Sequence, residues 1–354
     1  MKTAPFISRI FLFVCIVACS ASFAYAQSDS TEVIQSIGRD LVISMNPLHP
    51  SPGERVRFSL SSNLLNLEYT NIVWKQNDKE IGGGTGMVEF EITAGALGVK
   101  HIISADVSDK NLSAHAEAVI IPTQVDLLYD ADSYIPPFYK GRALPSAGSR
   151  IRMQAIAQFK RPDGTLIPES SIVYTWKQNG RIMNAVSGRG KSSATFDAPS
   201  LFGAHTIVVR AVSYDGVFSG ETSVVIPSVD PSVLLYEDHP LFGTMYHQAL
   251  ANNAVISDSE RTLVGVPHFA SVITLSDPQL LYEWRINNQT FVADPKKQSA
   301  LTINADNSSG KAHIDVAVTH RKNLSLDARG AWNILFKILN APTGLLNPFG
   351  ETVR

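Results

Sequence analysis

The sequence predicts an all-β protein made of three successive antiparallel β-sandwiches. Three observations lead to this prediction: a tryptophan-bearing strand that occurs three times, a spacing of about one domain between the copies, and the absence of long helical periodicity. Short β-rich runs separated by Gly, Pro, Asn and Asp are typical of sandwich folds. We expect helix only in short stretches near residues 246–254.

The first 26 residues have the pattern of a secretion signal. Lys2 and Arg9 bracket a short basic region, residues 10–18 form an apolar core, and Ala24-Tyr25-Ala26 is a small-x-small cleavage site. The apolar run is too short for a comfortable membrane span. We therefore expect cleavage after Ala26 and a mature chain without a transmembrane segment.

Both cysteines, Cys15 and Cys19, lie within this signal. An alternative interpretation takes residues 16–19 as a lipobox in which Cys19 is lipidated, although Ala-Tyr-Ala fits its cleavage site better. With cleavage after Ala26 the mature chain has no disulfide framework and no thiolate site. Each domain must then be held together by apolar burial alone.

The repeat is defined by two landmarks that share one period. Trp74, Trp176 and Trp284 are 102 and 108 residues apart, and each lies in a β-rich run that ends in Asn followed by Asp, Gly or Asn. A Leu-Leu-Tyr segment recurs with Tyr129 and Tyr236 separated by 107 residues. A period near one hundred residues indicates duplicated domains and not solenoid units.

Each tryptophan strand is followed by two further predicted strands. The first has a Gly-x-His-like start and the second closes the domain; they cover residues 98–107 and 114–121, 203–212 and 221–226, and 310–318 and 331–339. We place domain 1 at 30–122, domain 2 at 123–227 and domain 3 at 228–340. Pro122 and Pro227 lie in linkers without Gly or Ser runs, which predicts stiff connections.

The composition excludes some classes of function. The 354-residue chain has 44% hydrophobic and 18% charged residues with a net charge of −2, so no basic field suggests nucleic acid. No catalytic or metal-binding motif is complete, and we expect no cofactor. Residues 82–86 should form a flexible Gly-rich turn. A loose calcium site at the first junction, using Asp106, Asp109, Asp130 and Asp132, is an alternative to simple turn capping.

Aromatic residues near the domain junctions are the best binding candidates. They are Tyr134, Phe138 and Tyr139 early in domain 2, and their counterparts Phe242 and Tyr246 early in domain 3. Aromatic side chains with a few polar neighbours suit recognition. The same recurrence also fits residues that pack the joints between domains, and we favour this role.

The repeated elements resemble bacterial Ig-like and PKD-like extracellular domains. The resemblance covers most of residues 40–340 and rests on the Pro-rich turn at 50–54, the Y-x-W-x-x-N-G strand and the Gly-x-His-x-Ile-x-Val strand. It implies a sandwich with Trp74, Trp176 and Trp284 in the core, where an Ig domain would place its disulfide. Residues 177–180 replace the W-x-F-G-D-G-like turn of PKD domains. The Leu-Leu-Tyr segments resemble uncharacterised secreted proteins of candidate-phylum, Parcubacteria-type bacteria.

These features predict a secreted or cell-surface rod without catalytic activity, serving as a spacer, an adhesin or an envelope-assembly component. Its partner would be a protein or glycan at the cell surface. One alternative is a carbohydrate- or peptide-binding module that uses the junction aromatics, and a remote one is a hydrolase at a junction. The tail, residues 341–354, carries three large apolar residues and is either a frayed end or a docking peptide.

Overall fold

The computed structural model describes residues 41–109, 112–256, 260–304 and 310–336. The predicted signal at 1–26, Cys19 and the tail at 341–354 lie outside the described residues. Within the described part the secondary structure is strands, apart from two short 3-10 turns at Leu67–Tyr69 and Glu169–Ser171. The predicted all-β class is confirmed.

Unit 1 (41–120) is a sandwich of two antiparallel sheets. One sheet has the order β1-β2-β5 and the other the order β4-β3-β6-β7. The strands are β1 (Leu41–Asn46), β2 (Arg55–Ser62), β3 (Asn71–Gln76), β4 (Lys79–Thr85), β5 (Glu89–Thr93), β6 (His101–Asp109) and β7 (Leu112–Ile120). Alternate residues face inward, as in the buried–exposed pattern of β2, so one apolar core forms between the sheets.

Unit 2 (124–227) repeats the strand order of unit 1. Its sheets are β13-β9-β8 and β11-β10-β14-β15, with the short β12 also pairing with β10. The strands are β8 (Gln124–Ala131), β9 (Arg150–Gln158), β10 (Ile172–Gln178), β11 (Arg181–Ile182), β12 (Gly188–Arg189), β13 (Ser193–Asp197), β14 (Ala204–Ser213) and β15 (Ser219–Pro227). The strand pairing, and not only the sequence landmarks, is therefore duplicated.

Unit 3 (232–336) has the same two groups of strands, β22-β19-β16 and β21-β20-β23-β24, joined where Ser232 pairs with Arg329. The strands are β16 (Ser232–His239), β17 (Gly243–Ala249), β18 (Val255–Ile256), β19 (Glu260–His268), β20 (Leu280–Ile286), β21 (Gln289–Phe291), β22 (Ala300–Asn304), β23 (Gly310–His320) and β24 (Asp327–Phe336). The additional strands β17 and β18 pair with β16 and β24.

Two local expectations are wrong for the same reason. The stretch near 246–254 was expected to be helical, but β17 pairs with the edge of β16. The Gly-rich stretch was expected to be a flexible turn, but Gly82–Gly84 belong to β4 and pair with β3. A side chain at Gly83 would collide with the carbonyl oxygen of Ile72, so glycine permits this close approach of backbones. In both places sheet pairing outweighs local propensity.

The three repeated tryptophans occupy equivalent core positions. Trp74, Trp176 and Trp284 each have 0% exposure. Each indole nitrogen donates a hydrogen bond of 2.9 Å to a backbone carbonyl in the segment leading to β5, β13 or β22: Met87, Lys191 and Gln298. Each ring therefore fills the core and also ties a connecting segment to it. A fourth tryptophan, Trp332, is buried in unit 3 outside the repeat.

The turn after each tryptophan strand is built in the same way. Asn77, Asn179 and Asn287 adopt φ values of 49°, 50° and 49°, in the left-handed region that Asn tolerates. The side-chain oxygen of each accepts a 2.9 Å hydrogen bond from a backbone amide at the start of the neighbouring strand. The recurring Asn thus sets the turn and aligns the adjacent strand.

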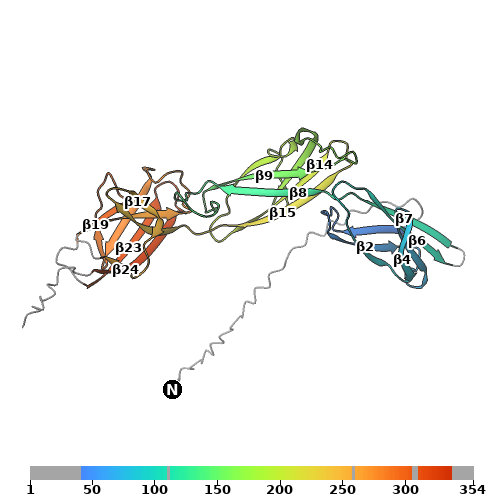
Figure 1. Ribbon diagram of the computed structural model, residues 1–354, viewed down its shortest axis with the longest axis horizontal. Coiled ribbons are helices and arrows are strands. Elements are labelled where there is room, and N and C mark those ends of the chain that lie inside the picture. Colours follow the sequence, from blue (N-terminus) through green and yellow to red (C-terminus); the bar gives the residue numbers. More distant parts are fainter. Residues whose placement is uncertain (1–40, 110–111, 257–259, 305–309, 337–354) are drawn as a thin grey trace, which may run out of the picture.

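The units follow one another in an elongated arrangement, with unit 2 in the middle (Figure 1). Strand β7 ends at Ile120 and β8 begins at Gln124, and β15 ends at Pro227 before β16 begins at Ser232. We call the contact region between units 1 and 2 the first joint, and that between units 2 and 3 the second joint. Apolar clusters lie within each unit, and Tyr134 of unit 2 packs against both clusters of unit 3.

Candidate functional site at the second joint

The loop between β8 and β9, residues 132–149, connects unit 2 to unit 3. The backbone amide of Tyr134 donates to the carbonyl of Ala270, and the amide of Phe269 donates to the carbonyl of Tyr134, both at 2.7 Å. Ala270 has no exposed surface. This reciprocal pair is the hydrogen-bonding unit of an antiparallel ladder, here formed between two units.

Two further hydrogen bonds hold the same joint, and a third supports it from within unit 3. The amide of Val229 donates to the carbonyl of Pro145 at 2.8 Å. The side-chain amide of Asn323 donates to the carbonyl of Ala147 at 3.2 Å and also to the hydroxyl of Ser271. The loop after β23 is therefore tied to unit 2 as well.

Aromatic rings fill the space behind this loop. Tyr139 meets the ring of His268 edge-on with a centroid distance of 5.9 Å, and the ring of Tyr236 lies nearly parallel to that imidazole at 6.2 Å. The Tyr236 hydroxyl lies 3.1 Å from Nε2 of His268. His268 is 5% exposed, and desolvation lowers its pKa because burial disfavours the charged ring.

The five predicted junction aromatics separate into two groups. Tyr134 and Tyr246 are half-buried, and Tyr139 is 36% exposed with its ring against the joint. Phe138 and Phe242 are 84% and 74% exposed. Phe242 stacks on His239 at 4.8 Å beside the turn that joins β16 and β17. The structure thus brings three of the five into one aromatic cluster and leaves two rings at the surface.

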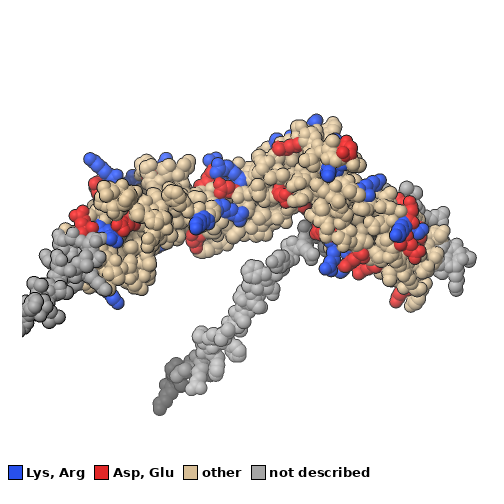
Figure 2. Space-filling view, in the orientation of Figure 1, with Lys and Arg blue, Asp and Glu red and all other residues tan. Residues whose placement is uncertain are grey.

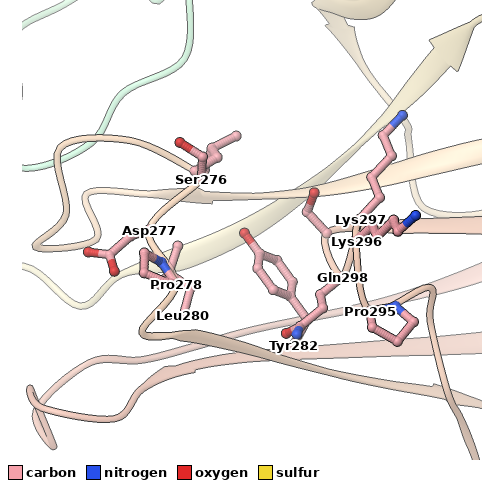
Figure 3. Close-up of a pocket in the computed structure, with 11 residues that line it drawn as sticks. Ser276, Asp277, Pro278, Leu280, Tyr282, Pro295, Lys296, Lys297 and Gln298 are labelled. Atoms are coloured by element: carbon pink, nitrogen blue, oxygen red, sulfur yellow. The ribbon is translucent and has the colours of Figure 1, made fainter.

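A cavity of about 350 Å³ opens in unit 3 beside this cluster. Leu275, which lines the cavity, packs against the same buried cluster as Tyr134 and Tyr246. Figure 3 shows the Tyr282 hydroxyl directed into the space between the segment with Ser276 and the segment with Lys297. The cavity is lined by residues 275–278, Leu280, Tyr282 and residues 295–299.

The Tyr282 hydroxyl is buried and has no hydrogen-bond partner among the described residues. Burial, and next the proximity of Tyr246, raise its pKa, so the group is protonated at neutral pH. The corresponding residue of unit 2 is Tyr174, two positions before the core tryptophan. It is 1% exposed, and burial raises its pKa to about 12.

One ion pair and one histidine–carboxylate contact lie beside the cavity. Nζ of Lys297 lies 2.5 Å from a carboxylate oxygen of Asp238, and Nε2 of His320 lies 3.6 Å from Asp277. Asp277 also accepts a hydrogen bond from the backbone amide of Gln279. Lys296, the other lysine of the lining, forms no ion pair with a described residue.

The sequence did not reveal the cavity residues, although it contained Tyr282. A Tyr two positions before Trp occurs in units 2 and 3 alike, and the alternating pattern predicts a core position for both. Pro295, Lys296 and Lys297 have the composition of an ordinary polar loop. No sequence signal distinguishes them, because the cavity depends on the separation of two loops that are distant in sequence.

Three of the four acidic residues considered for calcium contact basic side chains. Asp106 contacts Lys75 at 2.7 Å and His115 at 2.6 Å, whereas Asp130 and Asp132 contact Arg152 at 3.5 and 3.1 Å. The side chain of Asp109 lies outside the described residues. Across the described part of the chain, no group of three or more His, Cys, Asp or Glu has an arrangement that could hold a metal ion.

The face seen in Figure 2 carries Lys and Arg side chains interspersed with Asp and Glu along all three units. That face therefore has no extended field of one sign. None of the helical segments in the described ranges has the length and apolarity needed to span a bilayer.

No protein-family model matches the sequence, and no curated protein matches it. Among solved structures, the chain is similar to Sidekick-1 immunoglobulin domains 1–4, with 13% identity, 88% of this chain and 75% of that chain covered, and a TM-score of 0.20. It is similar to the central fibronectin-III array of RIM-binding protein, with 10% identity, coverages of 83% and 95%, and a TM-score of 0.28. A third is SGBP-B of the Bacteroides ovatus mixed-linkage glucan utilization locus, in complex with a mixed-linkage heptasaccharide, with 13% identity, coverages of 88% and 71%, and a TM-score of 0.25.

By their titles, the first two of these structures are arrays of immunoglobulin domains and of fibronectin-III domains. A relation to proteins of Parcubacteria-type bacteria finds no match in sequence and stays a prediction.

Proposed function

We propose that this chain is a non-catalytic, extracytoplasmic rod that serves as a spacer, an adhesin or an envelope-assembly component. Its domains would be 30–122, 123–227 and 228–340, each with its own core. The observation that supports a rod best is backbone hydrogen bonding across both joints, which adds to the effect of the short linkers.

The first joint is centred on Thr123. Its amide donates to the carbonyl of Pro50 in unit 1 at 3.1 Å, and its hydroxyl donates to the carbonyl of Ser219 in unit 2 at 2.7 Å. Thr123 is 2% exposed. Nδ1 of His49 lies 3.0 Å from the Ser219 hydroxyl, which links the two units directly. A residue buried between two domains restricts their rotation.

The second joint supports the same conclusion through the Tyr134–Ala270 pairing and the side chain of Asn323. Flexible Gly/Ser linkers behave as random coils and leave domains free to reorient. Neither linker here is of that kind, because Pro122 and Pro227 limit the backbone beside each joint.

Small-angle X-ray scattering on residues 27–354 tests the rod. We expect a pair-distance distribution with the long tail of an elongated particle. A matched variant with Gly-Gly-Ser-Gly-Ser inserted after Ser228 should show a broader distribution, because the second joint would be released. A profile typical of a compact globule for the unmodified chain would contradict the proposal.

Export is tested by the N-terminus of the mature chain. We expect Gln27 as the first residue, because cleavage follows Ala26. Intact-mass measurement of protein from the medium or envelope distinguishes this from a chain that begins at lipidated Cys19. Recovery of the chain with residues 1–26 still attached would contradict cleavage at either position.

A second candidate function is recognition of a glycan or peptide by the exposed rings of Phe138 and Phe242. Their exposures of 84% and 74% favour this candidate because both rings are open to a ligand, and Phe242 lies beside Leu241, which is 83% exposed. Glycan and peptide arrays with Phe138→Ala plus Phe242→Ala test it, and Tyr69→Ala in unit 1, with 74% exposure, is the control. Binding that survives the double substitution would eliminate this candidate.

A further inference from the structure

His268 lies where unit 2 meets unit 3, at the end of β19. The next residue, Phe269, donates its amide to the carbonyl of Tyr134 at 2.7 Å, and Ala270 after it accepts from the amide of Tyr134. The imidazole is therefore adjacent in sequence to the main-chain pair that closes the second joint. A displacement of this ring would disturb that pair directly.

Both units contribute to the surroundings of the ring. Tyr236 of unit 3 lies nearly parallel to it at a centroid distance of 6.2 Å, and Tyr139 of unit 2 meets it edge-on at 5.9 Å. Tyr139 also meets the ring of Phe269 at 5.7 Å. Only 5% of His268 is exposed. Because Tyr139 belongs to the loop 132–149, the docked loop helps to bury the ring.

The environment of His268 is also apolar along its own strand. Val264 and Val266 are buried with Tyr236 in the second apolar cluster of unit 3, and Tyr134 of unit 2 packs against that cluster. His268 follows the two valines at the same alternation of β19, so its side chain leaves the sheet on the same face. The ring thus occupies the joint end of this cluster.

The polar group that bonds to the imidazole is neutral. The Tyr236 hydroxyl lies 3.1 Å from Nε2, and a neutral imidazole bonds to a hydroxyl in either tautomer. Burial raises the pKa of Tyr236, so this hydroxyl does not become a counter-ion, and its ring is next to that of Tyr246 at 5.6 Å. In the described part of the chain, the contacts between a histidine and a carboxylate involve other histidines: His115, His313 and His320.

The protonated ring is therefore poorly accommodated in the closed joint. A charge buried without a counter-ion is costly, and desolvation accordingly lowers the pKa of His268. Release of the loop 132–149 would remove Tyr139 from the ring and admit water. The closed joint thus favours the neutral imidazole, and an open joint favours the charged one.

We propose that the second joint is an acid-sensitive hinge, in which protonation of His268 releases the loop 132–149 from unit 3 and lets the two units reorient. This inference rests on the rod proposed above and adds a condition under which the rod bends. A chain that is already flexible at neutral pH would contradict the rod. A rod that stays stiff in acid would contradict this inference alone.

The direction and size of the effect follow from linkage between protonation and closure. The pKa of His268 is lower in the closed joint than in an open one, where an exposed imidazole has its ordinary value of about 6.5. The contribution of the neutral ring is therefore complete above about pH 6.5 and is lost as the pH falls below it. At pH 5.0, about 1.5 units below that value, the closing equilibrium falls by at most about thirtyfold.

Distances between spin labels follow the joint in residues 27–354, which contain no cysteine. The labels are attached through Thr195→Cys in unit 2 and Thr290→Cys in unit 3, both at exposed positions. We expect a narrow distance distribution at pH 7.5 and a broad one at pH 5.0. Identical distributions at the two pH values would overturn the proposal.

Hydrogen exchange separates opening of the joint from unfolding of unit 3. The protection of the Tyr134 and Phe269 amides is compared with that of the Asn287 amide, which donates to the carbonyl of His313 within unit 3. With intrinsic rates corrected for pH, we expect the two joint amides to lose about tenfold more protection than Asn287 at pH 5.0. Equal losses at all three amides would show that the whole unit unfolds and would contradict a hinge.

Two variants without a titrating side chain test the role of His268. His268→Phe keeps the ring contacts and His268→Gln keeps a partner for the Tyr236 hydroxyl, so both should give the narrow distribution at both pH values. His320→Gln is the matched control, because His320 is at the same end of unit 3 but has the Asp277 carboxylate 3.6 Å from its Nε2. This control should broaden in acid as the unmodified chain does.

The remaining outcomes each contradict the assignment. An acid response retained in both His268 variants, or lost in His320→Gln, would assign the response to another group. A broad distribution at pH 7.5 in both His268 variants would show that the imidazole only fills space in the joint.

Discussion

Tyr134 and Ala270 belong to different units, yet the backbone amide of Tyr134 donates to the carbonyl of Ala270 at 2.7 Å. The carbonyl of Tyr134 in turn accepts from the residue before Ala270, at the same distance. The second joint is therefore formed by main chain as well as by side chains. Substituting the Tyr134 ring would remove packing, but these two hydrogen bonds do not depend on the identity of the side chain.

Gly98→Ala should loosen the first joint. Gly98 has a φ of +77°, and a Cβ there would collide with the carbonyl oxygen of Lys160 in unit 2. Gly53→Ala is a close control, because Gly53 has the same φ of +77° and nothing within 4 Å of the position of a Cβ. Both carry a conformational penalty of about 1 kcal/mol. Scattering should show a changed angle or broader distribution for Gly98→Ala alone, and identical profiles would contradict the clash.

Trp176→Ala should destabilise unit 2 by about 3–5 kcal/mol, because it removes a large ring with no exposed surface. It also removes the hydrogen bond to the carbonyl of Lys191. Denaturant unfolding followed unit by unit measures the effect, since a chain of several domains need not unfold in one transition. Tyr214→Ala is the control, because Tyr214 is 72% exposed. Equal losses for the two variants would be inconsistent with a core role.

Asn179→Ala and Asn179→Gly separate the two contributions of the repeated turn. Either change removes the 2.9 Å hydrogen bond from the amide of Thr206, which costs about 1 kcal/mol. Alanine adds the strain of a φ of 50°, whereas glycine adopts this conformation easily. We therefore expect Asn179→Ala to lower the free energy of unfolding more than Asn179→Gly. The reverse order in chemical denaturation would show that the left-handed conformation is not the constraint.

Acidification should weaken unit 3 through His268. Desolvation lowers the pKa of this imidazole in the folded state below its unfolded value of about 6.5. The unfolded chain then binds more protons below that value, so the stabilising contribution is complete above about pH 6.5 and is lost as pH falls below it. Hydrogen exchange resolved by unit at pH 7.5 and 5.5 measures this, and His268→Phe should remove the dependence.

His115 of unit 1 should act in the opposite direction. Its hydrogen bond to Asp106, and next that to Glu117, raise its pKa. Its contribution is therefore complete below the unfolded pKa and is lost as pH rises through the folded one. On acidification, unit 1 should lose less hydrogen-exchange protection than unit 3. The substitution His115→Gln should remove this stabilising effect of low pH on unit 1. Equal loss of protection in both units would contradict these assignments.

Short-range patterns explain why the strands could be predicted. Trp176 and its neighbours alternate between core and surface, and Asn179-Gly180 is a strong turn signal, so the strand and its end follow from local sequence. Where an expectation was wrong, pairing outweighed propensity: β17 is a strand because the edge of β16 accepts it. The backbone of Gly82–Gly84 is extended because β3 pairs with it.

The junction aromatics show the limit of sequence reasoning about the site. Tyr134, Phe138 and Tyr139 lie within six positions of one another and are chemically similar, and the sequence predicts one role for all three. In the structure Tyr134 packs in the joint, whereas Phe138 is 84% exposed. Which ring points inward depends on where unit 3 lies, and no local pattern contains that information.

The sequence by itself determined the all-β class and the positions of the core tryptophans and their turns, because alternation and turn chemistry act over a few residues. Only the tertiary structure decided which loops meet at the joints, and that Tyr282 faces a cavity while its counterpart Tyr174 is sealed in a core. These features depend on contacts between segments far apart in the chain. Such contacts are set by the packing of whole sheets and units, to which each residue contributes only a small part.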